Sequence, residues 1–110
     1  MLKEACVENF TNVPGVIERG AKRIELCDNL AVGGTTPSIG VIKITAEYCS
    51  DKDASIIVIL RPRGGDFVYS AMEKAIMMRD LEEIIVLQAN GIAVGALTAA
   101  NALDKPFLEE

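Results

Sequence analysis

Residues 56 to 60 read IIVIL, an unbroken apolar run that leads directly into the turn sequence RPRGGD at residues 61 to 66. A short β-branched run without polar alternation is typical of a strand buried on both faces, as in the parallel sheets of α/β proteins. We therefore predict a strand over residues 56 to 60. The turn then lies at the carboxyl end of that strand, where parallel α/β folds place their functional groups.

The turn after this strand has the composition of a binding loop. Arg61 and Arg63 offer guanidinium groups that suit carboxylates or phosphates. Gly64 and Gly65 allow positive φ angles and a close backbone approach, and Asp66 adds an acceptor. We therefore predict an anion-binding site formed by Arg61, Arg63, Gly64 and Gly65.

A structural explanation of the same turn stays open. Asp66 or Ser70 can be the N-cap of a following helix, and the two arginines can pair with acidic neighbours. Binding is the favoured interpretation, because a turn that only connects a strand to a helix rarely needs both Arg-x-Arg and Gly-Gly.

The composition fits one small globular domain. The chain has 110 residues, of which 50% are hydrophobic and 25% are charged, enough to build a single core. The net charge of -5 at pH 7, without a basic stripe, argues against nucleic acid as a partner. Since no apolar run approaches the ~20 residues that span a bilayer, and the first residues do not resemble a leader, we expect a cytoplasmic protein that has no membrane partner.

Cysteine and histidine usage narrows the possible chemistry. The three cysteines are an odd number without C-x-x-C spacing, so reduced thiols are expected rather than a disulfide framework or a zinc ribbon. The chain contains no histidine, which excludes Ser-His, Cys-His and His-metal sites made from this chain alone.

The rest of the chain alternates between strand and helix patterns. Further strands are predicted over residues 2–7, 23–27 and 92–97, and helices over about 12–19, 38–49, 70–89 and 105–110. The expected helix caps are Asn9 or Thr11, Thr36 and Asp104. Residues 84–87 also fit a short strand, but the helix is favoured. Strands that alternate with helices form serial βαβ crossovers, so we predict an α/β fold with a parallel sheet and helices outside it.

The pattern Glu-x-Cys occurs twice, as Glu4 and Cys6 in the first predicted strand and as Glu25 and Cys27 in the second. Side chains at i and i+2 of a strand share a face, so neighbouring parallel strands would bring both pairs together. Soft thiolates suit Cu(I) or zinc, whereas the carboxylates suit cations, substrate hydroxyls or acid-base work. The alternative that cysteines only fill the core stays open, and it is favoured for Cys49.

These residues stand in sequence blocks that resemble those of the CutC family, the so-called copper homeostasis proteins. The blocks are RIELC at residues 23–27, GGTTPSIG at 33–40, RPRGGDFVYS at 61–70 and GALT at 95–98. They follow the order of the family over nearly the whole chain.

The resemblance implies a TIM barrel, a cytoplasmic location and a role in copper handling. Family members are roughly twice as long, so residues 1–110 resemble the first four of eight βα units, a single partial or half barrel. The family's proposed copper-binding cysteines correspond to Cys6 and Cys27, which makes Cu(I) the expected metal. The mouth of the barrel would be lined by Glu4, Glu25, Arg61, Arg63 and Asp66.

Two functions follow as expectations. The first is a copper homeostasis protein that binds Cu(I) through the thiolates of Cys6 and Cys27. The second is a TIM-barrel enzyme of unassigned reaction that acts on a small anionic substrate. Its candidate catalytic residues are Glu25, Arg61, Arg63 and Asp66. Metal binding is favoured, because catalysis in such barrels normally needs groups from strands around the whole rim.

Self-association is also expected. A half barrel leaves unpaired strand edges at residues 2–7 and 92–97. Its inner face would expose Ile24 or Leu26, Ile57 or Ile59, and Val94 to water. An apolar patch of this kind usually marks an interface, so we predict a homo-oligomer.

Overall fold

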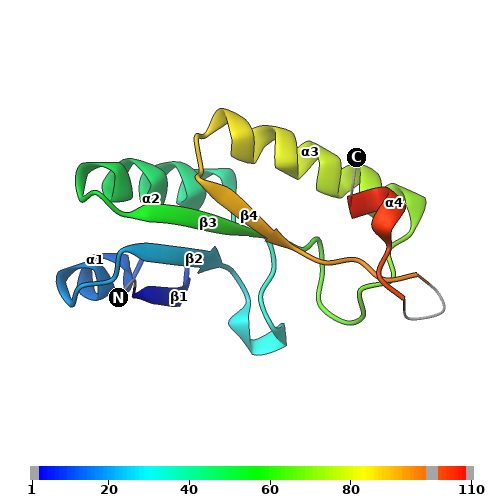
Figure 1. Ribbon diagram of the computed structural model, residues 1–110, viewed down its shortest axis with the longest axis horizontal. Coiled ribbons are helices and arrows are strands. Elements are labelled where there is room, and N and C mark those ends of the chain that lie inside the picture. The colour runs from blue at the N-terminus through cyan, green and yellow to red at the C-terminus, as the bar shows by residue number, and fades with distance from the viewer. Residues whose placement is uncertain (1–2, 99–101, 109–110) are drawn as a thin grey trace.

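A computed structural model describes residues 3–98 and 102–108. Its elements alternate between strand and helix along the chain (Figure 1). The strands are β1 (Glu4–Glu8), β2 (Arg23–Cys27), β3 (Ser55–Leu60) and β4 (Gly91–Val94). The helices are α1 (Val13–Glu18), α2 (Ile39–Asp51), α3 (Ala71–Val86) and α4 (Lys105–Leu108), with a 3-10 turn, η1, at Leu30–Val32.

The four strands form one parallel sheet in the order β1-β2-β3-β4. The register places Cys6 opposite Glu25, and Glu25 in turn opposite Ile57. Successive parallel strands need a crossover on one side of the sheet, which α1, α2 and α3 supply. The predicted α/β fold of serial βα units is therefore confirmed.

The first two helices begin at residues other than the predicted caps. Helix α2 is capped by Ser38, whose hydroxyl accepts a hydrogen bond from the Val41 amide, so Thr36 as N-cap was wrong. The Thr36 hydroxyl instead exchanges two hydrogen bonds with the Arg61 backbone. The N-cap position of α1 is Asn12, not Asn9 or Thr11, and its side chain makes no capping hydrogen bond.

The later boundaries agree better with the sequence patterns. A capping box formed by Ser70 and Glu73 starts α3, which continues to Val86. Residues 84–86 of the ambiguous segment 84–87 are therefore helical, and Leu87 is the C-cap. The Asp104 carboxylate accepts a hydrogen bond from the Phe107 amide at the start of α4, as predicted. Strand β4 ends at Val94 rather than at residue 97, while the predicted strand position at residue 2 and the predicted helix positions at residues 109 and 110 lie outside the described residues.

The helices cover one face of the sheet and build the core with it. Alternate strand residues point toward them, and Ile24, Leu26, Ile56 and Val58 are each at most 2% exposed. The helices add Val13 from α1, Ile42 and Cys49 from α2, and Met77 and Ile84 from α3. This covered face is the hydrophobic core of the domain.

The opposite face of the sheet carries no helix among the described residues, and we call it the open face. Its side chains come from the other alternate positions, including Cys6, Glu25, Ile57 and Ile59. The β3 strand is therefore buried on one side only, since Ile57 and Ile59 are half-buried. The prediction of a strand buried on both faces was wrong for this chain.

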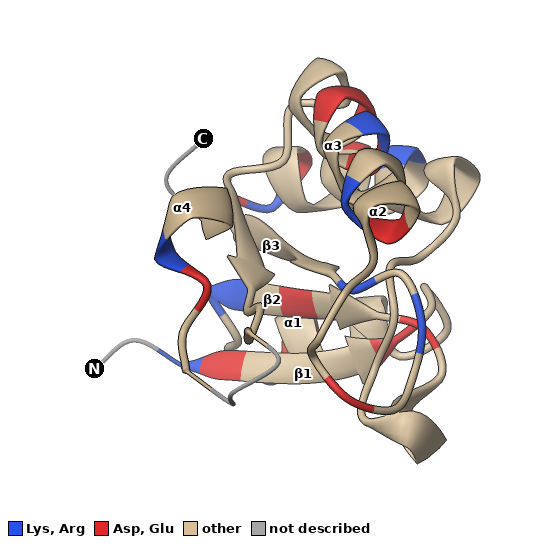
Figure 2. Ribbon diagram, turned by 90° about the vertical axis from the view of Figure 1, so that its right-hand side faces the viewer, with Lys and Arg blue, Asp and Glu red and all other residues tan. Residues whose placement is uncertain are grey.

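The open face differs from the predicted one in a second way. Ile24 and Leu26 point toward the helices, so neither contributes to the expected apolar patch. Figure 2 shows charged residues on β1 and β2, while β3 and β4 carry none. The open face therefore has a polar half on β1 and β2 and an apolar half on β3 and β4.

No helix within residues 3–98 and 102–108 combines the length and the hydropathy that crossing a bilayer requires.

Candidate functional site

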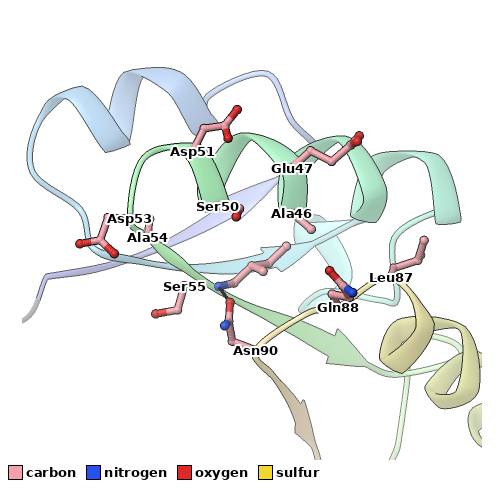
Figure 3. Close-up of a pocket in the computed structure, with 11 residues that line it drawn as sticks. Ala46, Glu47, Ser50, Asp51, Asp53, Ala54, Ser55, Leu87, Gln88 and Asn90 are labelled. Carbon is pink, nitrogen blue, oxygen red and sulfur yellow. Dashed lines mark hydrogen bonds between the residues drawn. The ribbon is translucent and has the colours of Figure 1, made fainter.

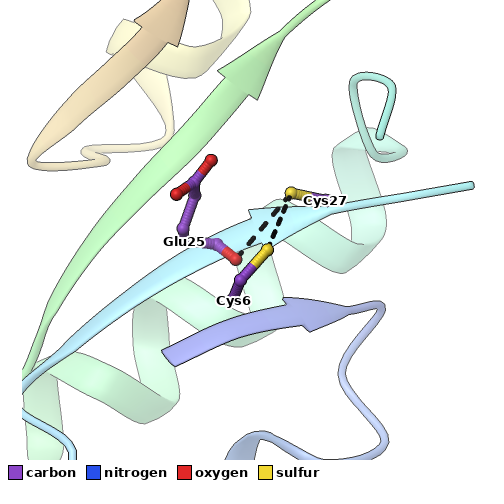
Figure 4. A group of neighbouring side chains, drawn as sticks. All are labelled: Cys6, Glu25 and Cys27. Atoms are coloured by element: carbon purple, nitrogen blue, oxygen red, sulfur yellow. Dashed lines mark hydrogen bonds between the residues drawn. The ribbon is translucent and has the colours of Figure 1, made fainter. Parts of the chain in front are cut away.

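Three side chains with metal-ligating atoms meet on the polar half of the open face. Cys6 lies in the middle of β1, and Glu25 and Cys27 lie on β2 (Figure 4). The two Sγ atoms are 3.8 Å apart. The two sulfurs and a carboxylate oxygen of Glu25 all lie within 4.8 Å of one another. The predicted convergence of the two Glu-x-Cys pairs is therefore confirmed for both cysteines and for Glu25.

The three side chains differ in their access to solvent. Cys6 is exposed, Glu25 is half-buried, and Cys27 is only 1% exposed. The loop after β2 covers Cys27, because an antiparallel bridge between Asp28 and Thr35 folds it back over the end of the strand.

Gly34 allows this loop to pack closely on the site. Its φ of +98° lies in the left-handed region, and a Cβ there would lie 3.2 Å from Ile59 Cδ1 and 3.5 Å from the Cys27 sulfur. A Cβ at this position would crowd Ile59 and contact Cys27, and the positive φ would strain the backbone of any other residue.

Burial raises the pKa of the Cys27 thiol to about 12. Burial is the largest cause of this rise, and the hydrogen bond with Cys6 and the nearby charges of Cys6, Glu25 and Glu8 account for the rest of it. The Cys27 sulfur therefore keeps its proton at neutral pH, and a cation bound at this site would have to displace it.

The separation of the sulfurs tests whether a metal ion fits. With metal–sulfur bonds of about 2.3 Å, as in zinc thiolates, a linear site would need sulfurs about 4.6 Å apart. The observed 3.8 Å corresponds to an angle of about 110° at such a metal, which leaves room for a third ligand. Glu25 offers that ligand, so the donor set fits a bent, three-coordinate site better than a linear one.

Glu4 does not join this cluster, although the sequence pattern placed it there. Its carboxylate forms an exposed ion pair with Arg23, the residue opposite it in the register. Glu8 takes the neighbouring position instead, opposite Cys27, and accepts a hydrogen bond from the Leu30 amide. Sequence reasoning missed Glu8, although its i+2 spacing from Cys6 placed it on the same face of the strand.

Arg61 ties together the loops at the carboxyl ends of β2 and β3. Its buried guanidinium donates hydrogen bonds to the carbonyl oxygens of Val32 (2.7 Å), Gly34 (3.0 Å) and Gly65 (2.8 Å). It also lies over the Phe67 ring. A Cβ on Gly33 would lie 2.9 Å from Nη1 of Arg61, so Gly33 makes space for this arginine.

Arg63 is held by acidic and backbone partners. It pairs with Glu73 and with Asp66, and it donates a hydrogen bond of 2.9 Å to the Val68 carbonyl. These contacts match the structural explanation of the RPRGGD turn, with Ser70 as the N-cap. Anion binding at Arg61, Arg63, Gly64 and Gly65 stays a prediction, and an anion there would have to compete with these internal acceptors.

A polar cavity of about 580 Å³ lies at the other end of the sheet (Figure 3). It is lined by the end of α2, the residues that follow α3, the start of β3 and the residues before β3 and β4, with Asp51, Asp53, Gln88 and Asn90 among them. The Asn90 side chain accepts a hydrogen bond from the Ile56 amide, which gives it a structural role. This cavity lies at the amino ends of the strands, opposite to the end where parallel α/β folds place their chemistry.

Comparison with known proteins identifies the family. The model of the CutC family matches residues 1–110. A CutC family protein from Enterococcus faecalis is 51% identical over 109 residues, and the match covers 99% of this chain and 52% of that protein. The human copper homeostasis protein cutC homolog is 39% identical over 104 residues, which cover 94% of this chain and 37% of the human protein.

A solved structure confirms the fold. The crystal structure of the CutC protein from Streptococcus agalactiae matches with a TM-score of 0.94 and 44% sequence identity, covering 99% of this chain and 52% of that one. This chain thus spans about half the length of that protein and forms part of a TIM barrel, as predicted. It belongs to the CutC family.

Proposed function

We propose that this chain binds one Cu(I) ion through Cys6 and Cys27, with Glu25 as a third ligand, and serves in copper homeostasis. The observation that carries the proposal is the 3.8 Å separation of the two sulfurs on neighbouring strands, with a carboxylate beside them. The name of the human relative, copper homeostasis protein cutC homolog, supports the choice of copper.

The chemistry of the ligands favours Cu(I) over harder cations. Thiolates are soft ligands that select Cu(I), whereas Mg²⁺ and Ca²⁺ prefer oxygen ligands only. The site needs reduced thiols, which fits our expectation that the protein acts in the reducing cytoplasm.

Competition with a Cu(I) chelator under reducing conditions tests the proposal. The parent and Cys49→Ser should bind one equivalent with equal affinity, because Cys49 lies in α2 on the covered face. Cys6→Ser and Cys27→Ser should each bind at least about tenfold more weakly, since each removes one of the two soft ligands. Equal affinity in all four proteins would rule the site out.

We also propose that these 110 residues self-associate through the open face. Within the described sheet, β1 and β4 each pair on one side only, and the apolar half on β3 and β4 includes Ile57, Ile59 and Ala93. A second copy could pair with both edges and cover this patch, as two half barrels closing into one. Sedimentation at micromolar concentration should show a dimer. A stable monomer that binds no hydrophobic dye would contradict this proposal.

A further inference from the structure

We propose that Cys6 and Cys27 also form a thiol–disulfide exchange site for small-molecule disulfides such as oxidised glutathione. In this reaction Cys6 is the residue that receives the small thiol, and Cys27 is the residue that removes it. The product is a disulfide bond between β1 and β2.

The different exposure of the two cysteines assigns these roles. Cys6 lies on an edge strand with its side chain exposed, so a small disulfide can approach its sulfur. Cys27 is 1% exposed beneath the loop after β2, so a bulky disulfide cannot reach it directly. Its sulfur nevertheless lies 3.8 Å from that of Cys6 and can attack a mixed disulfide formed there.

The two steps balance as follows. The Cys6 thiol loses its proton, and its thiolate attacks one sulfur of the small disulfide, which forms a mixed disulfide and releases one small thiolate that takes up a proton. The Cys27 thiol then gives up its proton, its thiolate attacks the Cys6 sulfur, the mixed disulfide breaks, and the second small thiolate leaves and takes up that proton. Two protein thiols are oxidised by two electrons, and the small disulfide is reduced to two thiols.

The register predicts that the resulting bond is strained and easily reduced. Cys6 lies opposite Glu25, and Cys27 lies opposite Glu8, so the two cysteines are diagonal neighbours rather than direct partners. Closing a bond of about 2.05 Å from the observed 3.8 Å requires the two side chains to turn toward each other across this diagonal, with a local shift of the backbone. Strand β1 can adjust in this way because, within the described sheet, it pairs with one neighbour only, and strained disulfides are the labile, regulatory ones.

Bond formation would switch off the proposed copper site. Both sulfurs of the donor set would be consumed, which leaves only the Glu25 carboxylate. This consequence rests on the proposed function, whereas the exchange reaction itself needs no metal.

The reaction can be tested on the metal-free chain with oxidised glutathione as the probe. The reaction is quenched with acid, the protein is denatured, and its free thiols are alkylated. Mass spectrometry then measures the mass of the protein. The parent and Cys49→Ser should each lose two alkylatable thiols without retaining glutathione. Cys27→Ser should instead accumulate one glutathione on Cys6, and Cys6→Ser should stay unmodified on the same time scale.

The outcomes separate this inference from the proposed function. A parent chain that retains glutathione on Cys6 as stably as Cys27→Ser does, or that never reacts at Cys6, would overturn the exchange site whatever its copper affinity. If the parent closes the bond, the oxidised form should bind Cu(I) at least about a hundredfold more weakly than the reduced form, and a reductant should restore binding. If reduced chain binds no copper, the proposed function fails while the exchange site stands.

Discussion

The two faces of the same sheet have opposite properties. On the covered face, Ile56 and Val58 are at most 2% exposed and pack with the helices. On the open face, Cys6 and Glu25 supply metal-ligating atoms, and Ile57 is half-buried beside them. Because strand side chains alternate between the faces, each strand contributes both to the core and to the site. A substitution at one strand position should therefore change the stability of the domain, and a substitution at the adjacent position should change the proposed site.

The sharpest test of this difference uses two adjacent isoleucines. Ile56→Ala should destabilise the fold by about 2–5 kcal/mol, because it opens a cavity in the core. Ile57→Ala should cost less than about 1 kcal/mol, because its side chain is only half-buried on the open face. Urea denaturation of both variants measures the free energies of unfolding. Equal large losses would show that the open face is covered in solution, as a dimer would cover it.

A somewhat smaller loss of stability is expected from a substitution in the loops that cover part of the open face. Arg61→Lys should destabilise the chain by about 3 kcal/mol, because an ammonium group cannot donate to the carbonyl oxygens of Val32, Gly34 and Gly65 together. Proteolysis of residues 28–35 should become faster at the same time. Arg79→Lys, on the exposed side of α3, is the matched control and should change neither measurement. A stable Arg61→Lys variant with a protected loop would contradict this role.

A smaller effect is the loss of stability at acid pH when Glu73 is protonated. Hydrogen bonds from Arg63 and from the Ser70 amide lower the pKa of Glu73 from 4.5 to about 2. The charged carboxylate is favoured in the fold, so its contribution to stability is complete above pH 4.5 and is lost as the pH falls toward 2.

Glu73→Gln isolates this contribution, because glutamine can still complete the capping box. The variant should unfold more easily than the parent at neutral pH, and the difference should vanish as the pH approaches 2. Chemical denaturation across this range measures both curves. A difference that does not change with pH would show that the ion pair with Arg63 adds nothing.

The smallest expected effect is anion binding at the turn after β3. Phosphate should raise the melting temperature only slightly, because it must displace Glu73 and Asp66 from Arg63. The increase should disappear in Arg63→Gln. A shift that persists in this variant would mean that phosphate acts elsewhere on the chain.

The sequence predicted the order and type of the strands and the convergence of Cys6, Cys27 and Glu25 correctly. Strand β2 begins and ends at the predicted residues, because its period-two pattern and flanking residues are local signals. The N-cap of α2 could not be found in this way, since the Thr36 hydroxyl is engaged by the Arg61 backbone, a contact across 25 positions.

The prediction that Ile24 or Leu26 lies on the inner face was wrong. Glu25 and Cys27 share the open face, so strict alternation along β2 makes Ile24 and Leu26 point to the helices. The internal partners of Arg61 were not predictable, because they are backbone carbonyl oxygens whose positions depend on how two loops fold together. Local patterns thus predict which residues share a face of the sheet, and the tertiary structure decides which hydrogen-bond donors remain available to a ligand.

X-ray absorption spectroscopy of the Cu(I)-loaded chain tests the central claim most directly. We predict a first shell of two sulfur atoms and one oxygen atom, with the oxygen lost in Glu25→Gln and one sulfur lost in Cys27→Ser. A first shell with fewer than two sulfurs in the parent, or one that is unchanged in Cys27→Ser, would contradict a copper site on the open face.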